Sequence, residues 1–570
     1  MNQSFNLYVH NFGKRETKLA YSNGANKVIY EYNGEGSQSR INSEKKTISD
    51  NPELFFYWNN EVIDKVTAFV NEIFNAFSSD KENYYTFQEY LKCFLRKKLS
   101  SDIRLLVLAQ GDTDAVMNLD YPITMKKIYR NRKIIGIEYH SYLTAARNCL
   151  FIMLKVLKWP LKFYKKKIKS DHLLIPYYEN VKLNSEFFSL YNVINNSTII
   201  VNNNSDLHKY LVSNKKNIVK KNDLYITPHQ LIFLLVKGIK LLIKFPNKFK
   251  SPLLVDAVFS YIKDYANLLS YFNSVNVQHV GVIRGDVYSA SSLLREVSSS
   301  LGITTYSFSH SVYFYREYYL ATVDYDWYGV SGQNEKGIYS GLWNDKMNYV
   351  SIGQITSGFR ELDSVNNWTN VNTSKKNVVC VYPTTVSEQV IPNNTTNFNQ
   401  FIDAVCSSCE NNKVSVLYKS KINFKLSRND KVDDGQKDID ALTIEKMKKH
   451  LSDKFTLFDN DISVYDTFDH IDIGYVYSMS TVAFELIQNK KKVLVYWPFE
   501  SNHHPFSKYT PLLVAANEND FVVKAKKLLE MQYSEYEKYI IPTLEYCLVS
   551  PSDNISVNKF IELVESNSSN

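Results

Sequence analysis

Short apolar runs alternate with amphipathic segments along most of the chain. The clearest unit follows Gln278, where HVGVIRGDV predicts a strand and loop, SASSLLREVSSSLG a helix, and GITTYSFSHS a second strand and loop. Ser289 or Ser291 can cap the helix and Gly302 can end it. Parallel strands need such a crossover, so this βαβ unit indicates a parallel sheet. DYDWYGVSG and MNYVSIGQITSG predict two further short strands.

A second alternating run follows the polar stretch SVNNWTNVNTSKKN, which lacks an apolar period and predicts a domain linker. The strands expected in this run are NVVCVYPTT, KVSVLYKSK, FTLFDN, DIGYVYS and KKVLVYW, and the helices are NFNQFIDAVCSSC, IDALTIEKMKKHLS, STVAFELIQNK and FVVKAKKLLEMQ. Strands and helices at this spacing require mostly parallel, doubly wound sheets. The sequence therefore predicts an α/β fold with two Rossmann-like domains that face a cleft.

The N-terminal part has a different pattern. Residues up to about Asn51 are polar and contain glycine, and ELFFYWNNEVIDKVTAFVNEIFNAF is aromatic-rich and predicted helical. IRLLVLAQGDTD predicts a buried strand that feeds a loop, and KIIGIEY and STIIVNN predict further strands. We therefore expect an accessory mixed or helical module at 1–100, a first Rossmann-like domain at 101–363 and a second at 377–570.

Composition supports a globular protein of more than one domain. A chain of 570 residues exceeds what one core organises, and 44% hydrophobic residues with few Gly and Pro exclude a collagen-like or disordered chain. Six scattered cysteines do not form a disulfide framework, and the pair Cys406 and Cys409 lacks the second pair of a zinc site. The N-terminus has no signal-peptide core, and no apolar run of about 18 residues occurs. We expect a cytoplasmic protein without a membrane-spanning helix.

The net charge of +8 is partly concentrated in two lysine-rich apolar stretches, CLFIMLKVLKWPLKFYKKKIKS and LIFLLVKGIKLLIKFPNKFK. Both resemble basic amphipathic segments that lie on anionic membranes, so peripheral contact with the inner face of the cell membrane is one interpretation. The other is a core-facing helix with a solvated lysine edge. Nucleic-acid binding is disfavoured, because neither stretch interleaves aromatics with Arg and Gly.

The most informative turn is YSMSTVAFELIQ, where Ser478, Ser480 and Thr481 stand between a buried strand and a helix. Their hydroxyls and free amides would face a phosphate at the carboxyl edge of the sheet. Glu485, about one turn into the helix, would accept hydrogen bonds from a ribose. The structural alternative is that Ser480 only caps the helix and Glu485 is a solvated acid.

Three more residues of this half are donor-site candidates. Lys419 ends the strand in KVSVLYKSK, where its ammonium would neutralise a diphosphate. Thr384 and Thr385 follow the first strand and would add hydroxyl donors. A surface lysine and an ordinary turn are the alternatives.

In the first half, Arg284 and Asp286 follow one strand and His310 follows the next. Arg284 is a donor-binding candidate. Either Asp286 or His310 would be the base that takes a proton from an acceptor hydroxyl, although a histidine at a strand end is often a packing residue. His503 and His504 rank lower, because an adjacent pair before proline is typical of a surface turn.

The chain from about Val280 onward resembles bacterial surface-polysaccharide transferases of the GT-B fold, which include capsule glycosyltransferases and teichoic-acid CDP-glycerol glycerophosphotransferases. The resemblance rests on GVIRGDVYSASSLLREVSSSLGITTYSFSHS, YVSIGQITSGF, VLYKSK and SMSTVAFELIQNKKKVLVYW. Such enzymes carry a loop in which a histidine is followed by glycine. At the corresponding place in this chain, His310 is followed by Ser311. Their lysine loop and Ser/Thr turn with a helical acid are similar to Lys419, Ser480, Thr481 and Glu485.

The resemblance implies a glycosyltransferase of the cell envelope that uses a nucleotide-sugar donor and a surface-polysaccharide or lipid-linked glycan acceptor. It implies no cofactor, and without a DxD motif after a strand we expect no required metal ion. The alternatives are a CDP-polyol phosphotransferase, a non-catalytic glycan- or membrane-binding assembly protein, and a sugar-nucleotide epimerase.

Overall fold

The computed structural model describes most of the chain after residue 166 and shorter parts before it. The described residues are 5–10, 25–31, 70–71, 85–94, 104–108, 135–158, 160, 167–176, 179, 191, 194–203, 205–244, 252–283, 290–309, 323–340, 347–353, 377–384, 395–410, 412, 414–420, 431–458, 464–478, 480–498, 504–547 and 555–567. Apart from Asn377, the predicted linker lies outside these ranges.

The first large sheet has seven strands in the order β12-β11-β10-β9-β5-β6-β7, and every pairing in it is parallel. The strand order reverses between β5 and β9, which are neighbours in the sheet. The strands are β5 (His172–Ile175), β6 (Ser197–Val201), β7 (Asn217–Lys220), β9 (His279–Ile283), β10 (Thr304–Phe308), β11 (Trp327–Val330) and β12 (Asn348–Ser351).

The second large sheet has six parallel strands in the order β15-β14-β13-β16-β17-β18. Numbered along the chain this order is 3-2-1-4-5-6, the order of a Rossmann domain. The strands are β13 (Val378–Tyr382), β14 (Ser415–Tyr418), β15 (Phe455–Leu457), β16 (Ile473–Tyr477), β17 (Lys492–Tyr496) and β18 (Val514–Ala515). Every strand predicted in this half is present.

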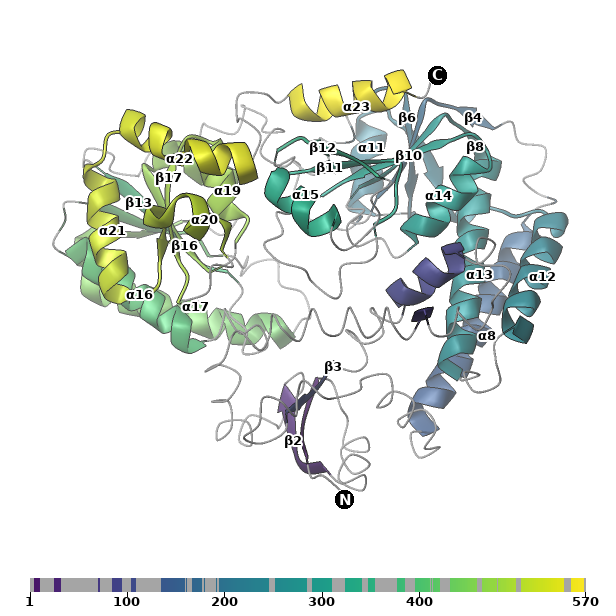
Figure 1. The fold of residues 1–570 in the computed structure, drawn as a ribbon, viewed down its shortest axis with the longest axis horizontal. Coiled ribbons are helices and arrows are strands. Elements are labelled where there is room, and N and C mark those ends of the chain that lie inside the picture. The colour runs from purple at the N-terminus through teal and green to yellow at the C-terminus, as the bar shows by residue number, and fades with distance from the viewer. Residues whose placement is uncertain are drawn as a thin grey trace.

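Helices cover both sheets, and the two sheets form separate lobes (Figure 1). The first lobe carries α8 (Ile135–Leu157), α11 (Asp206–Ser213), α12 (Pro228–Lys244), α13 (Pro252–Ser274), α14 (Ser291–Ser299) and α15 (Gln333–Ser340). The second carries α16 (Thr395–Glu410), α17 (Lys431–Leu451), α18 (Val464–Thr467), α19 (Val482–Gln488), α20 (Pro505–Tyr509), α21 (Glu518–Glu530) and α22 (Tyr533–Cys547). The chain is therefore an α/β protein of two Rossmann-like domains, which is the predicted GT-B fold. None of the described helices combines the length and the hydropathy needed to cross a bilayer.

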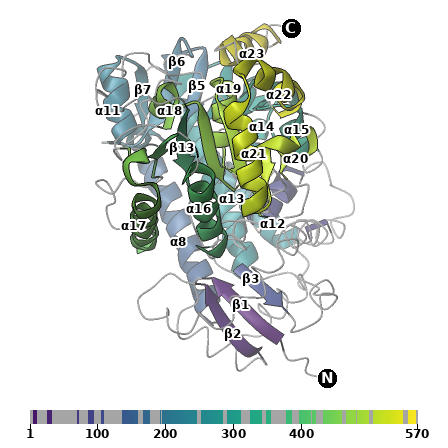
Figure 2. The ribbon, with the colours of Figure 1, turned by 90° about the vertical axis from the view of Figure 1, so that its left-hand side faces the viewer.

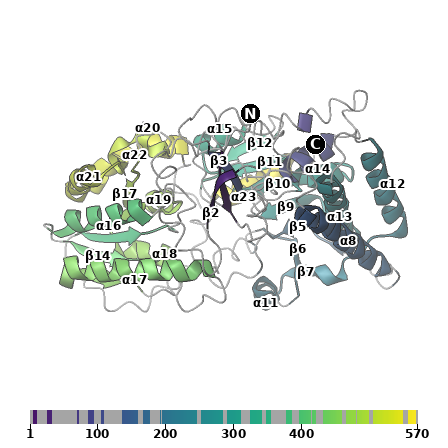
Figure 3. The same ribbon diagram turned by 90° about the horizontal axis from the view of Figure 1, so that it is seen from below.

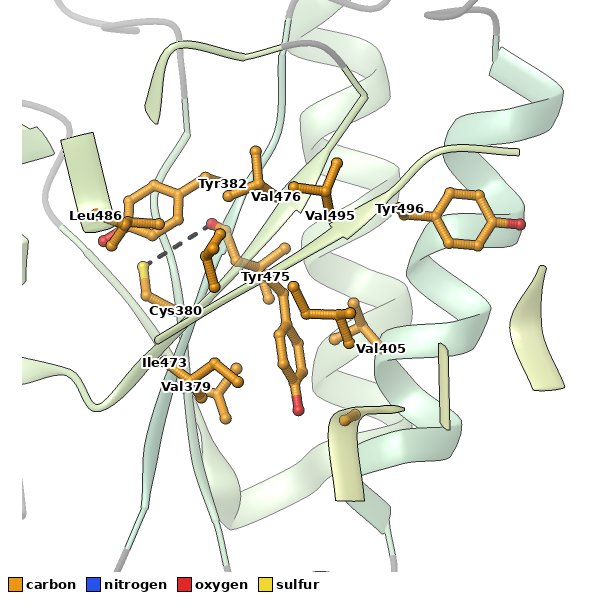
Figure 4. Close-up of a cluster of buried hydrophobic side chains, with 14 of the residues drawn as sticks. Val379, Cys380, Tyr382, Val405, Ile473, Tyr475, Val476, Leu486, Val495 and Tyr496 are labelled. Atoms are coloured by element: carbon orange, nitrogen blue, oxygen red, sulfur yellow. Dashed lines mark hydrogen bonds between the residues drawn. The ribbon is translucent and has the colours of Figure 1, made fainter. Parts of the chain in front are cut away.

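Each sheet is buried on both faces, which explains its nearly continuous apolar strands. In β5, Leu173 and Ile175 belong to the core under α13 and α14, whereas Leu174 belongs to the core on the other face. The second sheet shows the same alternation: Tyr475 lies with Val405 of α16 on one side of the strands, and Val476 lies on the other (Figure 4).

The last helix, α23 (Ile555–Asn567), returns from the second lobe to the first and lies above its sheet in Figure 1. Phe560 is fully buried against the rings of Tyr306 and Phe308, each with a centroid distance of 6.2 Å. Glu565 Oε1 lies 2.8 Å from Nε2 of buried His172. The second face of the first sheet is therefore completed by the end of the chain.

Of two strands predicted upstream of this sheet, the structure confirms one, in a different sheet, and corrects the other. Arg104–Leu108 is a strand, β3, but it pairs antiparallel with β1 (Phe5–His10) in a small sheet of order β2-β1-β3, with β2 at Ala25–Glu31 (Figure 2). It therefore lies outside the first Rossmann-like sheet, to which the division at residue 101 assigned it. KIIGIEY is not a strand, because Ile135 begins the 23-residue helix α8. A short apolar run does not distinguish a buried strand from a buried helix.

The structure confirms the predicted C-terminal end of α14 at Gly302 and corrects the predicted cap at its N-terminal end. Ala290 is the N-cap and makes no side-chain capping bond, and Ser291 is the first helical residue and is buried, so Ser291 is not the cap. Ser289 lies outside the described residues. At the other end Gly302 has φ of +68°, and the amide of Ile303 donates to Ser298 O at 2.9 Å, as expected of a glycine that ends a helix.

Candidate functional site

The second sheet has a topological switch point between β13 and β16. β14 and β15 lie on one side of this pair and β17 and β18 on the other, so successive crossovers leave in opposite directions. In open α/β sheets ligands bind outside the carboxyl ends of the strands at such a point. Ser478 follows β16 directly and Thr384, which is buried, follows β13 by two residues. The structure thus brings two predicted donor-site residues to the switch point.

Ser478 has the most unusual environment of the predicted residues. It is fully buried, and its hydroxyl has no hydrogen-bond partner among the described residues. Its φ is +59°, in the left-handed region that costs a non-glycine residue about 1–2 kcal/mol. Its amide donates to Tyr496 O at 2.9 Å, which continues the β16–β17 ladder and fixes the strained residue in place. Strain combined with a buried unsatisfied hydroxyl is typical of a ligand site.

Ser480, Thr481 and Glu485 follow in and before α19, which is seven residues long. Thr481 is the N-cap and makes no side-chain capping bond, while the Ser480 hydroxyl accepts only a long bond of 3.4 Å from the Val482 amide. Glu485 is 6% exposed, so the interpretation as a solvated acid is wrong. Burial and Cys380, with a smaller contribution from the Glu485 carboxylate, raise the pKa of Tyr382, which places Glu485 near the end of β13.

Lys419 lies directly after β14, the other neighbour of β13. Its amide donates to Val381 O at 3.1 Å, and its Nζ donates to Ser420 O at 2.9 Å. Lys419 and Ser478 are therefore on one edge of the sheet, separated by two strand spacings of about 5 Å each.

The end of β14 is held by a residue that the sequence analysis did not identify. Asp440 of α17 is fully buried, and its two carboxylate oxygens accept bonds from Ser420 Oγ and, at 2.9 Å, from Tyr418 Oη. The sequence contains a signal for this residue, namely an acid on the face of a helix that becomes buried. Asp440 shares this face of α17 with Thr443 and Met447. Asp440 therefore holds the side chains of both residues that flank Lys419.

The residues predicted on the first domain are Arg284, Asp286 and His310, and all three lie outside the described residues, as do Thr385 and His503 of the second domain. The strands that precede the first three are described. β9 and β10 pair in parallel from Thr304 opposite His279 to Phe308 opposite Ile283. The carboxyl ends of these two strands, Ile283 and Phe308, therefore lie opposite each other at one edge of the sheet.

Another acid missed in the sequence lies one strand further along this edge. Glu335, in the first turn of α15, is fully buried, and its Oε2 accepts bonds from the amide and the hydroxyl of Ser331, both at 2.6 Å. The sequence does not signal this cap, because Glu335 follows Ser331 by four residues, whereas the acid of a capping box follows its serine by three. Because α15 also contacts α22, Glu335 stabilises the part of this edge that touches the second domain.

His504 is not in a surface turn, contrary to the prediction from its sequence. It is fully buried, its ring lies 4.9 Å from that of Phe506, and its Nδ1 accepts a bond from the Phe506 amide at the start of α20. Burial lowers the pKa of His504 from 6.5 to about 3.

This shift predicts a pH-dependent stability. In the unfolded chain His504 binds a proton below pH 6.5, whereas in the folded chain it stays neutral down to about pH 3. Between these pH values the free energy of unfolding therefore falls by about 1.4 kcal/mol for each unit by which the pH is lowered. His504→Asn keeps a capping acceptor and removes the titration. Urea denaturation measures the free energy of unfolding at pH 7 and at pH 5. Between these two pH values the variant should lose about 2 kcal/mol less of it than the wild type does. The exposed His229→Asn serves as control, and equal pH dependence in His504→Asn and wild type would contradict the assignment.

Cys406 and Cys409 lie buried on α16, where burial raises their thiol pKa values to about 12 and about 11. Such thiols are packing residues and poor thiolate ligands at neutral pH. Among the described side chains, no group of three or more His, Cys, Asp or Glu is placed to hold a metal ion.

No protein-family model matches the chain, and no curated protein matches it. Solved structures do align with it. MurG from Acinetobacter baumannii covers 70% of this chain and 99% of its own at 9% identity and a TM-score of 0.37. HepE from Anabaena, in complex with UDP and glucose, covers 70% and 100% at 9% identity and a TM-score of 0.40. A Listeria monocytogenes protein described as a UDP-N-acetylglucosamine 2-epimerase covers 70% and 97% at 10% identity and a TM-score of 0.44.

Proposed function

We propose that this protein is a glycosyltransferase that binds a nucleotide-sugar donor at the carboxyl edge of the second sheet. The observation that supports this most is Ser478, a strained and buried serine at the switch point whose hydroxyl has no partner among the described residues. A phosphate oxygen would accept its hydrogen bond. Nearby, Lys419 supplies a positive charge and Glu485 an acceptor.

The donor is held by residues that complement its parts. Lys419 neutralises the diphosphate, with Ser478, Ser480 and Thr481 donating hydroxyl hydrogens to it. Glu485 accepts from the ribose hydroxyls. Thr384 and Thr385 add donors from the end of β13. Arg284 approaches the diphosphate from the first domain.

The transfer step is acid–base chemistry supported by electrostatic stabilisation. Asp286 or His310 takes the proton from the acceptor hydroxyl while its oxygen bonds to the anomeric carbon. The bond from that carbon to the diphosphate breaks, and the nucleoside diphosphate leaves with the electron pair. Lys419 stabilises the charge that develops on the leaving group, so neither a metal ion nor another cofactor is part of the proposal.

The acceptor we propose is a surface polysaccharide or a lipid-linked glycan, reached from the cytoplasmic face of the cell membrane. The domain division is part of the proposal: the acceptor domain ends near residue 363, the donor domain starts near residue 377, and the donor lies in a cleft between them. An accessory module precedes both.

The proposal is tested by Ser478→Gly. Glycine relieves the positive φ and removes the unpartnered hydroxyl, so the folded state should gain about 1 kcal/mol in the same variant that loses a donor contact. We expect higher thermal stability together with about tenfold weaker nucleotide binding, measured by calorimetry with UDP, GDP and CMP and by nucleotide release from their sugar conjugates.

The matched control is Lys490→Gly, an exposed residue with φ of +57° beyond the far end of α19. It should gain stability without a change in nucleotide binding. Failure of every nucleotide to bind the wild type would contradict the proposal and favour a non-catalytic binding protein. Binding by Ser478→Gly as tight as by wild type would remove Ser478 from the site. Glycerol phosphate transfer from a CDP-linked donor would show a polyol phosphotransferase instead.

A further inference from the structure

The outward side of α12 is apolar, which is unusual for a helix on the surface of a domain. Its inward side packs against α13, and Gly238 allows this contact, since a Cβ there would lie 2.1 Å from Ile262 Cδ1. The side of the helix that carries Gly238 is therefore the one that fits closely against α13. Exposed large hydrophobic side chains on α12 are Ile232, Phe233, Leu235, Val236, Ile239 and Ile243.

The end of α8 is partly inverted: its inward side carries two polar residues beside buried Ile152, and its outward side is mostly apolar. Asn148 and Lys155 are buried against α13, where they donate to Ser260 Oγ at 3.2 Å and Ser270 Oγ at 2.8 Å. Burial, with smaller effects of Lys158 and Lys221, lowers the pKa of Lys155 to about 7. The exposed residues of the same turns are Leu150, Phe151, Met153, Leu154 and Leu157.

The two apolar surfaces belong to one region of the molecule. α8 and α12 both pack against α13 and contact each other, and the three helices lie at the end of the first lobe away from the second (Figures 1 and 3). Eleven of the nineteen large hydrophobic side chains that are exposed in the described structure lie on these two helices. We call the surface formed by those eleven residues the α8–α12 face.

The exposed charged side chains that the structure describes on α8 and α12 are basic, and Lys237 of α12, which is less exposed, pairs with Glu296 of α14 at 2.9 Å. Arg147, Lys240 and Lys244 are exposed on the two helices. The sequence from 139 to 170 and from 224 to 255 contains no Asp or Glu, although both stretches contain several lysines. The interpretation of the two lysine-rich stretches as core-facing helices with a solvated lysine edge therefore describes only part of their surface. The outward side of each helix is mainly apolar, and the lysines lie beside it.

We propose that the α8–α12 face docks on the surface of an anionic lipid bilayer. The apolar side chains enter the boundary between headgroups and acyl chains, and the lysines contact anionic headgroups. A second copy of the chain fits this face less well, since a two-fold contact would bring the lysines of both copies together. The docking depends on neither the donor site nor the transfer reaction.

The test is sedimentation of the full-length protein with vesicles of phosphatidylcholine alone or with about one third phosphatidylglycerol. The wild type should bind the anionic vesicles on the order of tenfold more tightly than the neutral ones, with binding weakened by salt. Ile239→Asp/Ile243→Asp on α12 and Leu154→Asp/Leu157→Asp on α8 should each weaken it about tenfold or more. Lys240→Glu/Lys244→Glu should remove the preference for anionic lipid.

The control is Val523→Asp, an equally exposed position on α21 of the second lobe, which should bind as the wild type does. Circular dichroism verifies the fold of each variant, and nucleotide binding, measured separately, should be unchanged. The inference would be overturned if the wild type did not bind vesicles, or if neither aspartate pair weakened its binding. It would also be overturned if the wild type self-associated without binding vesicles and the aspartate pairs abolished this self-association. The last would assign the face to a second copy.

Discussion

Removing the ammonium of Lys419 is expected to weaken donor binding about 10- to 100-fold. Lys419→Ala deletes a charge-assisted contact to the diphosphate, and such contacts contribute about 1.5–3 kcal/mol. The fold should tolerate the change, because the Lys419 amide keeps its bond to Val381 and Asp440 continues to hold Ser420. Titration calorimetry with the nucleotide and its sugar conjugate at two salt concentrations measures the loss.

Two variants separate charge from geometry at this position. Lys419→Arg keeps the charge and should retain more affinity than Lys419→Ala. Lys446→Ala removes a lysine that pairs with Asp403 at 2.5 Å between α17 and α16, and it should leave binding unchanged. Equal affinity of wild type and Lys419→Ala would place the diphosphate elsewhere.

Phe560→Ala is expected to cost about 3–5 kcal/mol of stability at the attachment of α23. The ring is fully buried between Tyr306 and Phe308, and its removal leaves a cavity on one face of the first sheet. Chemical denaturation measures the loss, and limited proteolysis should cut the C-terminal segment of the variant sooner. Leu563→Ala, 41% exposed on the same helix, should cost less than about 1 kcal/mol. Unchanged stability and protease resistance in Phe560→Ala would contradict the packing of α23.

Much of the fold follows from local sequence pattern. The pattern predicts five of the six strands of the second domain and the helices α16, α17, α19 and α21, because these strands are short apolar runs separated by amphipathic segments, whereas it does not predict β18, α18, α20 or α22. The order of those strands also placed Lys419, Thr384 and Ser478 at one edge, since parallel strands end together. The pattern of apolar and polar residues is sufficient to predict the elements where strands are buried on both faces and helices bury one apolar face.

Other features depend on contacts that a linear pattern does not contain. The positive φ of Ser478 accompanies a bond from its amide to Tyr496 O of β17, and Asp440 acts through residues about 20 positions earlier in the chain. Ile135 starts a helix despite a strand-like sequence, and Arg104–Leu108 pairs with the N-terminus. The partly inverted end of α8 has ordinary composition, so only the structure shows which side faces out.

The position of α23 has a mechanical consequence. The chain passes between the lobes twice, once between β12 and β13 and once between α22 and α23. Two bodies tied at one point can swing freely in any direction, whereas two ties restrict them to rotation about the line that joins the ties. Two crossings restrict the relative movement of the lobes more than one does, and undocking α23 would leave only the crossing between β12 and β13.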